Sequence, residues 1–357
     1  MCNELTGVCL CSSVEETVLN HGTDWSNLNF LNSIDLRNAD LTKIVLPKDP
    51  LFLQKIMGKS LMYTRFSSQD LSGYDWKDVN IEHTRFSKDT VLPADENFLQ
   101  IISDKSIYDT HLPEMDMSSW CWNDVLIVGA QFHKNTKLPL DKNFFQNLKG
   151  KNLNDCILPK MNMDLYDWTN VLIMDTKFTS DSIVPTDVKF LQKIKDKSIF
   201  GVTLPKITNV VWDWTDVCLK NVVFTKDSIL PANRDFLQQL RGKSIFGCVM
   251  PEMDMRHWDW DDVVINGCVF SNNTLLPNTP EFLSNLKEGF KYFRKLPYLD
   301  MHLNWDLTND FLCFYSLQIK DVSKIKYFSY KHIRDKLLEN SKMSDISIED
   351  MFLIKNV

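Results

Sequence analysis

The chain has 357 residues and a formal net charge of −7, and 44% of its residues are hydrophobic. This acidic balance excludes a general nucleic-acid binder, because such proteins carry a basic face. The absence of any run of about 18 apolar residues excludes a membrane-spanning helix. The nine cysteines contain no CxxC pair and no Cys/His grouping at zinc spacing. We therefore expect no metal site, no cofactor and a reducing, cytosol-like environment.

The first residues, 1–22, show no register with the text that follows, and we predict an irregular N-terminal segment there. This segment lacks the basic and apolar regions of a conventional secretory signal. Cys2, Cys9 and Cys11 lie close together in it. Without a nearby His pair, these cysteines favour a loose terminus over a metal site.

Beyond the terminus, large residues recur at a fixed interval, and Trp122 follows Trp76 by 46 positions. The tryptophan column is Trp76, Trp122, Trp168, Trp214 and Trp260. One phenylalanine column is Phe86, Phe132, Phe178, Phe224 and Phe270, and another is Phe52, Phe98, Phe144, Phe190, Phe236 and Phe282. Such self-similarity predicts stacked repeats, in which each unit buries its apolar face against its neighbours.

Within each repeat, large apolar residues stand five positions apart. One such run is Ile107, Leu112, Met117, Trp122, Ile127 and Phe132. This period fits neither a helix nor an alternating strand. It predicts a chain that turns a corner every five residues and points one central side chain inward from each face. Small or β-branched residues two positions before a centre, such as Val79 and Thr84, would fill the corners.

This pattern resembles the pentapeptide-repeat family, whose units read roughly A(D/N)LXX. The nearest single match is Ala39-Asp40-Leu41-Thr42-Lys43. The resemblance covers about residues 23–277 and implies a right-handed, four-sided β-helix, so the predicted fold class is a mainly β solenoid. Trp and Met at several centres depart from the family's preference for Leu or Phe and imply a wider or less regular coil.

About 16 residues between the pentapeptide runs predict a short α-helix in every 46-residue unit. A column of N-cap residue types opens these segments: Asp49, Asp95, Asp141, Asp187, Asn233 and Thr279. Apolar residues such as Phe98, Leu99 and Ile102 follow on one helical face. Lysines close each segment at Lys59, Lys105, Lys151, Lys197 and Lys243. A helix of about ten residues is too short to stand alone in water, so we expect it to dock on the coil.

Residues 278–357 begin like a sixth helix but do not return to a coil. Their aromatic text predicts helices that either cap the last coil of the solenoid or form a small functional domain. Both interpretations stay open at this point.

The text FLQQLRGKSIFGCVMPEMDM, residues 236–255, resembles the β-helix domain of secreted bacterial ubiquitin ligases of the SopA/NleL type. In that family the β-helix precedes HECT-like lobes that carry a catalytic cysteine. Only Cys313 follows the repeats here, in an apolar setting that would raise its pKa. The resemblance therefore implies an effector-like scaffold without the ligase lobes. It also implies a protein partner, such as a host ubiquitin-system component, and an action in the cytoplasm or, after specialised secretion, in a host cell.

No phosphate-binding glycine loop, Ser/His/Asp grouping or HExxH motif occurs, so we predict no catalytic residue. We expect a non-enzymatic scaffold that binds a partner protein through the flank of the β-helix. Two other functions stay open. One is a topoisomerase inhibitor that mimics DNA, and the other is a truncated or divergent HECT-like ligase that uses Cys313.

An aromatic column is the first candidate binding site. It comprises Tyr74, Trp120, Tyr166, Trp212 and Trp258, each two residues before a central tryptophan. These side chains are large for a corner. We expect them either to pack beneath the helices, which we favour, or to form a half-exposed ladder for a protein partner, because Trp and Tyr dominate interface hot spots.

An acidic column is the second candidate. It comprises Asp78, Asp124, Asp216 and Asp262, two residues after successive tryptophans, with Asn170 in the series. Facing outward, these residues would form a line that mimics a phosphate backbone. The alternative, which we favour, is that each Asp stabilises a corner turn through its own backbone.

Overall fold

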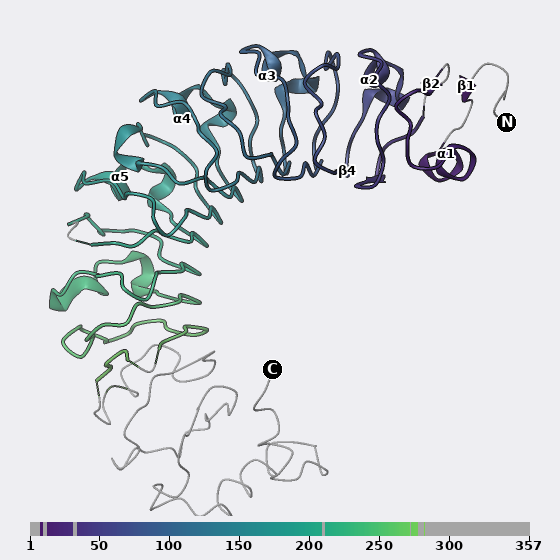
Figure 1. The fold of residues 1–357 in the computed structure, drawn as a ribbon. Coiled ribbons are helices and arrows are strands. Elements are labelled where there is room, and N and C mark those ends of the chain that lie inside the picture. The colour runs from purple at the N-terminus through teal and green to yellow at the C-terminus, as the bar shows by residue number, and fades with distance from the viewer. Residues whose placement is uncertain are drawn as a thin grey trace, which may run out of the picture.

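The computed structural model describes residues 8–9, 13–30, 34–208, 211–271, 273–277 and 282. In this part of the chain the backbone winds as stacked coils along a curved axis (Figure 1). The short helices α2 to α5 lie on the outer side of the arc, and strand β4 lies on the inner side. Residues 278–281 and 283–357, including Cys313 and Thr279, lie outside the described residues, as do the predictions made for them.

Neighbouring coils are joined by parallel pairing. Strand β1, Val8–Cys9, pairs with β2, Asn29–Phe30, and β3, Asp40–Leu41, pairs with β4, Arg65–Phe66. Single bridges continue this ladder from Arg65 to Arg85 and from Arg85 to His111. These steps span 20 and 26 residues, which together make the 46-residue repeat. One repeat is therefore two coils, and the longer coil carries the helical insertion.

The residues predicted at the pentapeptide centres are buried. The five central tryptophans expose at most 4% of their surface, and Leu61, Ile107, Leu153 and Ile199 expose none. The rings interlock, since Trp76 meets Phe98 edge-on at a centroid distance of 5.5 Å. One-sided burial at every fifth position is what a chain that turns a corner every five residues requires, because the intervening residues face outward or fill the corners.

The corner residues are also buried, and each polar one has a partner. Val79 and Thr84 expose no surface, and the Thr84 hydroxyl donates to the carbonyl of Leu61 at 2.7 Å. Cys268 occupies the equivalent place and donates from Sγ to Ile245 at 2.8 Å. Burial raises the pKa of the Cys156 and Cys248 thiols to about 12. The predicted interior position of these free cysteines is confirmed.

The helical insertions are shorter than predicted. The α-helices are α2 Phe52–Lys55, α3 Phe98–Ile101, α4 Phe144–Asn147 and α5 Phe190–Lys193. In the fifth insertion a 3₁₀ turn, η6 Arg234–Phe236, takes their place. Each insertion ends in a 3₁₀ turn: η1 Met57–Lys59, η2 Ser103–Lys105, η3 Lys149–Lys151, η5 Lys195–Lys197 and η7 Arg241–Lys243. Another 3₁₀ turn, η4 Met163–Leu165, lies in a coil.

The predicted ten-residue helix is wrong for two local reasons. An extended residue, Ile56 with ψ 153°, separates α2 from η1 and turns its side chain into the core. The carboxylate predicted as an N-cap instead closes a turn before the helix, since Asp49 accepts from the main-chain N–H of Leu51 at 3.0 Å. The N-cap of α2 is Leu51, which makes no side-chain cap bond.

The N-terminal segment also differs from the prediction. Residues 1–22, predicted as irregular, contain helix α1, Val14–His21. The Ser13 hydroxyl caps it by accepting from the N–H of Glu16 at 3.1 Å, and Glu15 and Glu16 place negative charge in its first turn. Helix α1 lies outside the five-residue register, so that register does not predict it.

Candidate functional site

The aromatic column is part of the core. Trp120, Tyr166, Trp212 and Trp258 expose 3–6% of their surface, and Tyr74 is partly buried. Trp120 packs on the helix residue Phe98 with ring centroids 4.9 Å apart. The role of an exposed binding ladder is therefore wrong for these residues, because the helical insertions cover them.

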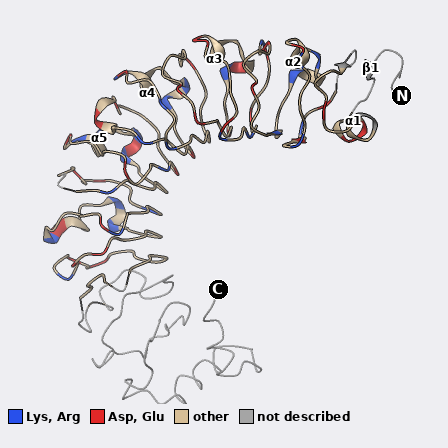
Figure 2. Ribbon diagram, viewed as in Figure 1, with Lys and Arg blue, Asp and Glu red and all other residues tan. Residues whose placement is uncertain are grey.

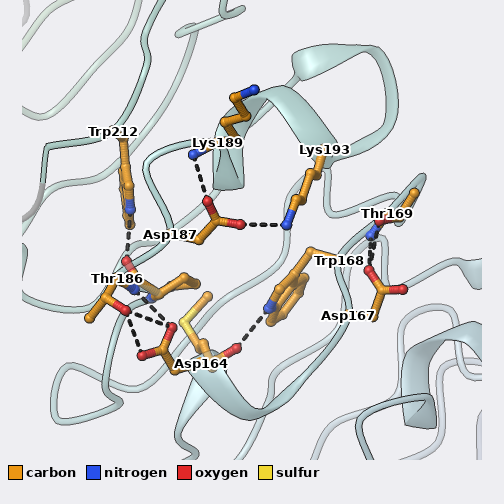
Figure 3. Close-up of polar contacts among 11 residues, drawn as sticks. Asp164, Asp167, Trp168, Thr169, Thr186, Asp187, Lys189, Lys193 and Trp212 are labelled. Carbon is orange, nitrogen blue, oxygen red and sulfur yellow. Dashed lines mark hydrogen bonds and ion pairs between the residues drawn. The ribbon is translucent and has the colours of Figure 1, made fainter.

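Each polar tip of this column has a fixed partner. The Nε1 of Trp212 donates to the main-chain carbonyl of Pro185 at 2.8 Å (Figure 3). The same bond joins Trp120 to Pro93 and Trp258 to Pro231, and the tyrosine hydroxyls reach Pro47 and Pro139. Trp and Tyr can replace each other here because both present an apolar body and one hydrogen-bond donor.

The acidic column lies at exposed corners with left-handed backbone. Asp78, Asp124, Asp216 and Asp262 have φ between 59° and 62°, and Asn170 has φ 59°. Asp and Asn tolerate this conformation better than other non-glycine residues. The N–H of Asp124 donates to the carbonyl of Asn147 at the end of α4. The corner turn thus accounts for the column, although through backbone conformation and not through a side-chain bond.

Cations accompany three of these carboxylates. Lys59 lies 3.5 Å from Asp78, and Lys243 lies 3.9 Å from Asp262. Arg241 contacts Asp216 at 3.1 Å and holds the pKa of that carboxyl below its usual value. Acidic and basic residues are interspersed along the described coils (Figure 2). This mixture weakens the case for mimicry of a phosphate backbone, which needs an unbroken negative line.

A glutamine column joins each helix to the next coil. The Nε2 of Gln146 donates to the carbonyl of Asp167 at 2.9 Å and to that of Thr169 at 3.0 Å. The other members, which bond in the same way, are Gln54, Gln100, Gln192 and Gln238. Their 46-residue spacing is visible in the sequence, although its purpose is not.

Aspartates one position before a centre close the remaining corners. Asp167 accepts from the N–H and the hydroxyl of Thr169 at 2.9 and 2.7 Å (Figure 3). The Thr169 hydroxyl is the main cause that lowers the pKa of Asp167. These contacts close local turns, so we assign these carboxylates a structural role.

The exposed column on the inner side of the arc differs from those above. We name it the inner ladder, and its bridged residues are Asp40, Arg65, Arg85, His111, Gln131, Ile157, Lys177, Thr203, Val223, Val249 and Val269. Each precedes an inward centre and therefore points outward, because successive side chains of a strand face opposite sides. All are exposed or half-buried. The ladder is charged at its N-terminal end and apolar at its C-terminal end.

A depression of about 410 Å³ lies at the charged end. Its walls include Tyr63, Arg65, His83, Arg85 and Asp109. Tyr63 and His83 stack with ring centroids 4.4 Å apart, and His83 Nδ1 lies 2.9 Å from Asp109 Oδ2. None of these residues belongs to a motif or column that the sequence singles out as a candidate site, so this cluster was not predicted.

The backbone at this depression is unusual. Tyr63 and His83 have φ 60° and 58° at corners where other coils place Gly129, Gly201 or Asp155. A left-handed conformation is rare for a bulky residue and costs of order 1–3 kcal/mol. The ring stack and the His83–Asp109 contact hold these side chains in place. The alternation of small and large residues at these corners is the signal that could have identified the cluster.

Comparisons with known proteins add no identity: no family model matches the chain, and no curated protein matches it. Among the described residues, no group of three His, Cys, Asp or Glu side chains is arranged to hold a metal ion. Within the same part of the chain, no helix has the length and apolar character needed to span a membrane.

Proposed function

We propose that residues 23–277 form a pentapeptide-repeat β-helix that serves as a non-enzymatic scaffold and binds an extended segment of a partner protein along the inner ladder. Solenoids create extended concave surfaces suited to this use. The burial of the aromatic column supports a shift of the binding surface from the helix-bearing flank to the inner side of the arc.

The observation that carries the proposal is the inner ladder itself. Residues of the packed columns keep their type from repeat to repeat, because each makes the same contact. The inner ladder changes from Arg85 through Gln131 to Val249 while its backbone pairing stays the same. Exposed arginines at one end of the ladder and half-buried valines at the other offer a partner both charge and apolar area, which is the composition of a protein interface.

Neither alternative function gains support. The cations beside Asp78, Asp216 and Asp262 count against DNA mimicry. The ligase hypothesis depends on Cys313, which lies outside the described residues. Buried thiols with raised pKa, such as Cys156 and Cys248, are poor nucleophiles because the thiol form predominates.

A peptide-display selection on the purified full chain tests the function. Selected peptides should bind the wild type and lose at least about tenfold in affinity, roughly 1.4 kcal/mol, with Val223→Arg plus Val249→Arg. Val188→Arg is the matched control, because Val188 is 53% exposed beside α5 on the outer side. Failure to enrich peptides, or equal loss in the control, would overturn the proposal.

A further inference from the structure

Two arginines stand side by side at the charged end of the inner ladder. Arg65 and Arg85 are bridged on neighbouring coils, and His111 follows on the next. Adjacent coils lie about 4.8 Å apart, and like charges in directly opposed positions destabilise a sheet. Burial lowers the pKa of His111, and the charge of Arg85 lowers it further. The two adjacent arginines therefore repel each other and do not stabilise the fold.

No carboxylate within the described residues lies at ion-pair distance from either arginine. Two carboxylates line the depression nearby, and each has another hydrogen-bond partner. Asp40 accepts from the Thr42 hydroxyl at 2.6 Å, which lowers the pKa of Asp40, and the charge of its bridged neighbour Arg65 also helps to lower that pKa. Asp109 contacts His83 at 2.9 Å. Both guanidinium groups therefore have free donors beside the depression, and Arg65 and Arg85 are exposed.

Aromatic rings form the other wall of this depression. Tyr63 is 50% exposed and stacks on His83. Tyr108 supports this wall from outside the depression, since it meets His83 edge-on at 5.2 Å. Exposed rings held in fixed positions lose little entropy on binding and supply contact area. The depression thus combines two guanidinium forks and an aromatic platform with the carboxylates of Asp40 and Asp109, which also line it.

We propose that this depression, which we name the arginine pocket, binds an acidic stretch of the partner segment. Carboxylates of that stretch pair with Arg65 and Arg85, and a neighbouring apolar side chain packs on Tyr63. This inference rests on the proposed function, since it assigns the chemistry of one end of the bound segment. Planar guanidinium groups bind carboxylates in two-point geometry.

An acidic peptide fits better than a nucleic acid. A single strand needs a basic groove that follows its backbone, but beyond His111 the inner ladder offers only Lys177 as a cation. The other ladder residues beyond His111 are apolar or neutral polar: Gln131, Ile157, Thr203, Val223, Val249 and Val269. A segment that is acidic at one end and apolar at the other matches both halves.

The test uses a fluorescein-labelled peptide of about ten residues, with glutamates followed by valines and leucines, and measures fluorescence anisotropy on the full chain. Arg65→Gln with Arg85→Gln should weaken binding at least about tenfold. Tyr63→Gly should weaken it less while suiting the left-handed backbone. Arg241→Gln, on the side of the insertions, is the matched control and should leave affinity unchanged.

Three outcomes would overturn the inference: no binding of the acidic peptide to the wild type, equal binding to the double variant, or tighter binding of a single-stranded oligothymidylate. The display selection separates the two proposals. Non-acidic peptides that require Val249 but ignore Arg65 and Arg85 would refute the acidic stretch and leave the scaffold function standing. Loss of all binding to the inner ladder would refute the function itself.

Discussion

The indole Nε1 of Trp212 donates a 2.8 Å hydrogen bond to the carbonyl of Pro185, which lies 27 residues earlier in the chain. The ring is 3% exposed and packs on Phe190 of α5 with centroids 5.1 Å apart. One side chain thus ties a corner, a helix and the preceding coil together. The column to which Trp212 belongs stabilises the fold and is unsuited to direct recognition.

Replacing Trp212 with Phe should therefore destabilise the protein. The change removes a donor from a buried carbonyl and shrinks the ring, and we expect a loss of about 2–4 kcal/mol in the free energy of unfolding. Urea unfolding followed by circular dichroism measures this loss. Trp212→Tyr restores the donor that Tyr166 provides in the preceding repeat and should recover part of the loss. A wild-type midpoint for Trp212→Phe would contradict this role.

The glutamine column should prove structural in the same way. Gln146→Leu removes two hydrogen bonds to main-chain carbonyls of the next coil, and we expect a cost of about 1–3 kcal/mol. Gln131→Leu is the control, because Gln131 faces outward on the inner ladder. The same urea experiment compares the two variants. Equal midpoints would show that the Gln146 bonds contribute nothing.

Two glycines test how closely coils approach at the corners. Gly242 has φ 63° and no atom within 4 Å of the place that a Cβ would take, whereas a Cβ on Gly201 would lie 1.9 Å from Asp175 Oδ1. Alanine should cost about 1 kcal/mol at Gly242 from backbone strain alone. At Gly201 it should cost roughly a further 0.5–1.5 kcal/mol, because the flexible Asp175 carboxylate must leave its rotamer to make room. Thermal unfolding measures both. Adding Asp175→Gly should remove the extra cost, and its persistence would refute the steric explanation.

The acidic column makes a prediction about backbone conformation. Asp124 has φ 59°, so Asp124→Asn should leave stability within about 0.5 kcal/mol of wild type, as Asn170 implies. Asp124→Ala should cost about 1 kcal/mol, because alanine tolerates the left-handed region poorly. Chemical unfolding at two salt concentrations checks both values. If Asn were as costly as Ala, charge and not conformation would explain the column.

Tyr166, which is buried, and Tyr74, which is partly buried, should make stability depend on alkaline pH. Burial raises the pKa of Tyr166 to about 12, and burial with nearby Asp49 and Asp70 does the same for Tyr74. Because the folded pKa lies above the unfolded value of about 10, the neutral phenols contribute stability below about pH 10. This contribution is lost as the pH rises from about 10 to about 12.

The measurement is the free energy of unfolding at about pH 9 and pH 11. Tyr74→Trp with Tyr166→Trp should flatten the dependence on pH, because an indole does not titrate there and Trp120 shows that it fits the column. An unchanged slope would mean that these phenols ionise as freely in the folded protein as in the unfolded chain.

Much of the local structure could be predicted from the sequence. Burial of Trp76 and Leu61 follows from a five-residue period, and the corner role of Val79 follows from its size. The helical insertion was placed correctly by the Phe98 column, but its length was not. The extended Ile102, with ψ 160°, divides the insertion into a short α-helix and a 3₁₀ turn. Helix-capping residues in the sequence do not indicate that a side chain in the middle of the insertion must turn into the core.

The candidate site could not be predicted in the same way. Tyr63 and His83 stand 20 positions apart, at corner positions whose residue type changes from repeat to repeat, so their ring stack depends on the distance between two neighbouring coils. Trp120 and Arg85 look equally available in the sequence, since both lie outside the centres. Only the packing of Phe98 over Trp120 hides one and leaves the other open.

The sequence by itself determined which residues form the centres and corners, because a fixed period repeats the same local requirement in every unit. The tertiary structure alone decided which outward column meets solvent and which a helix covers. That choice depends on contacts between coils 20 and 26 residues apart, where stacking curves the array, encloses the aromatic column on one side and exposes the arginines on the other.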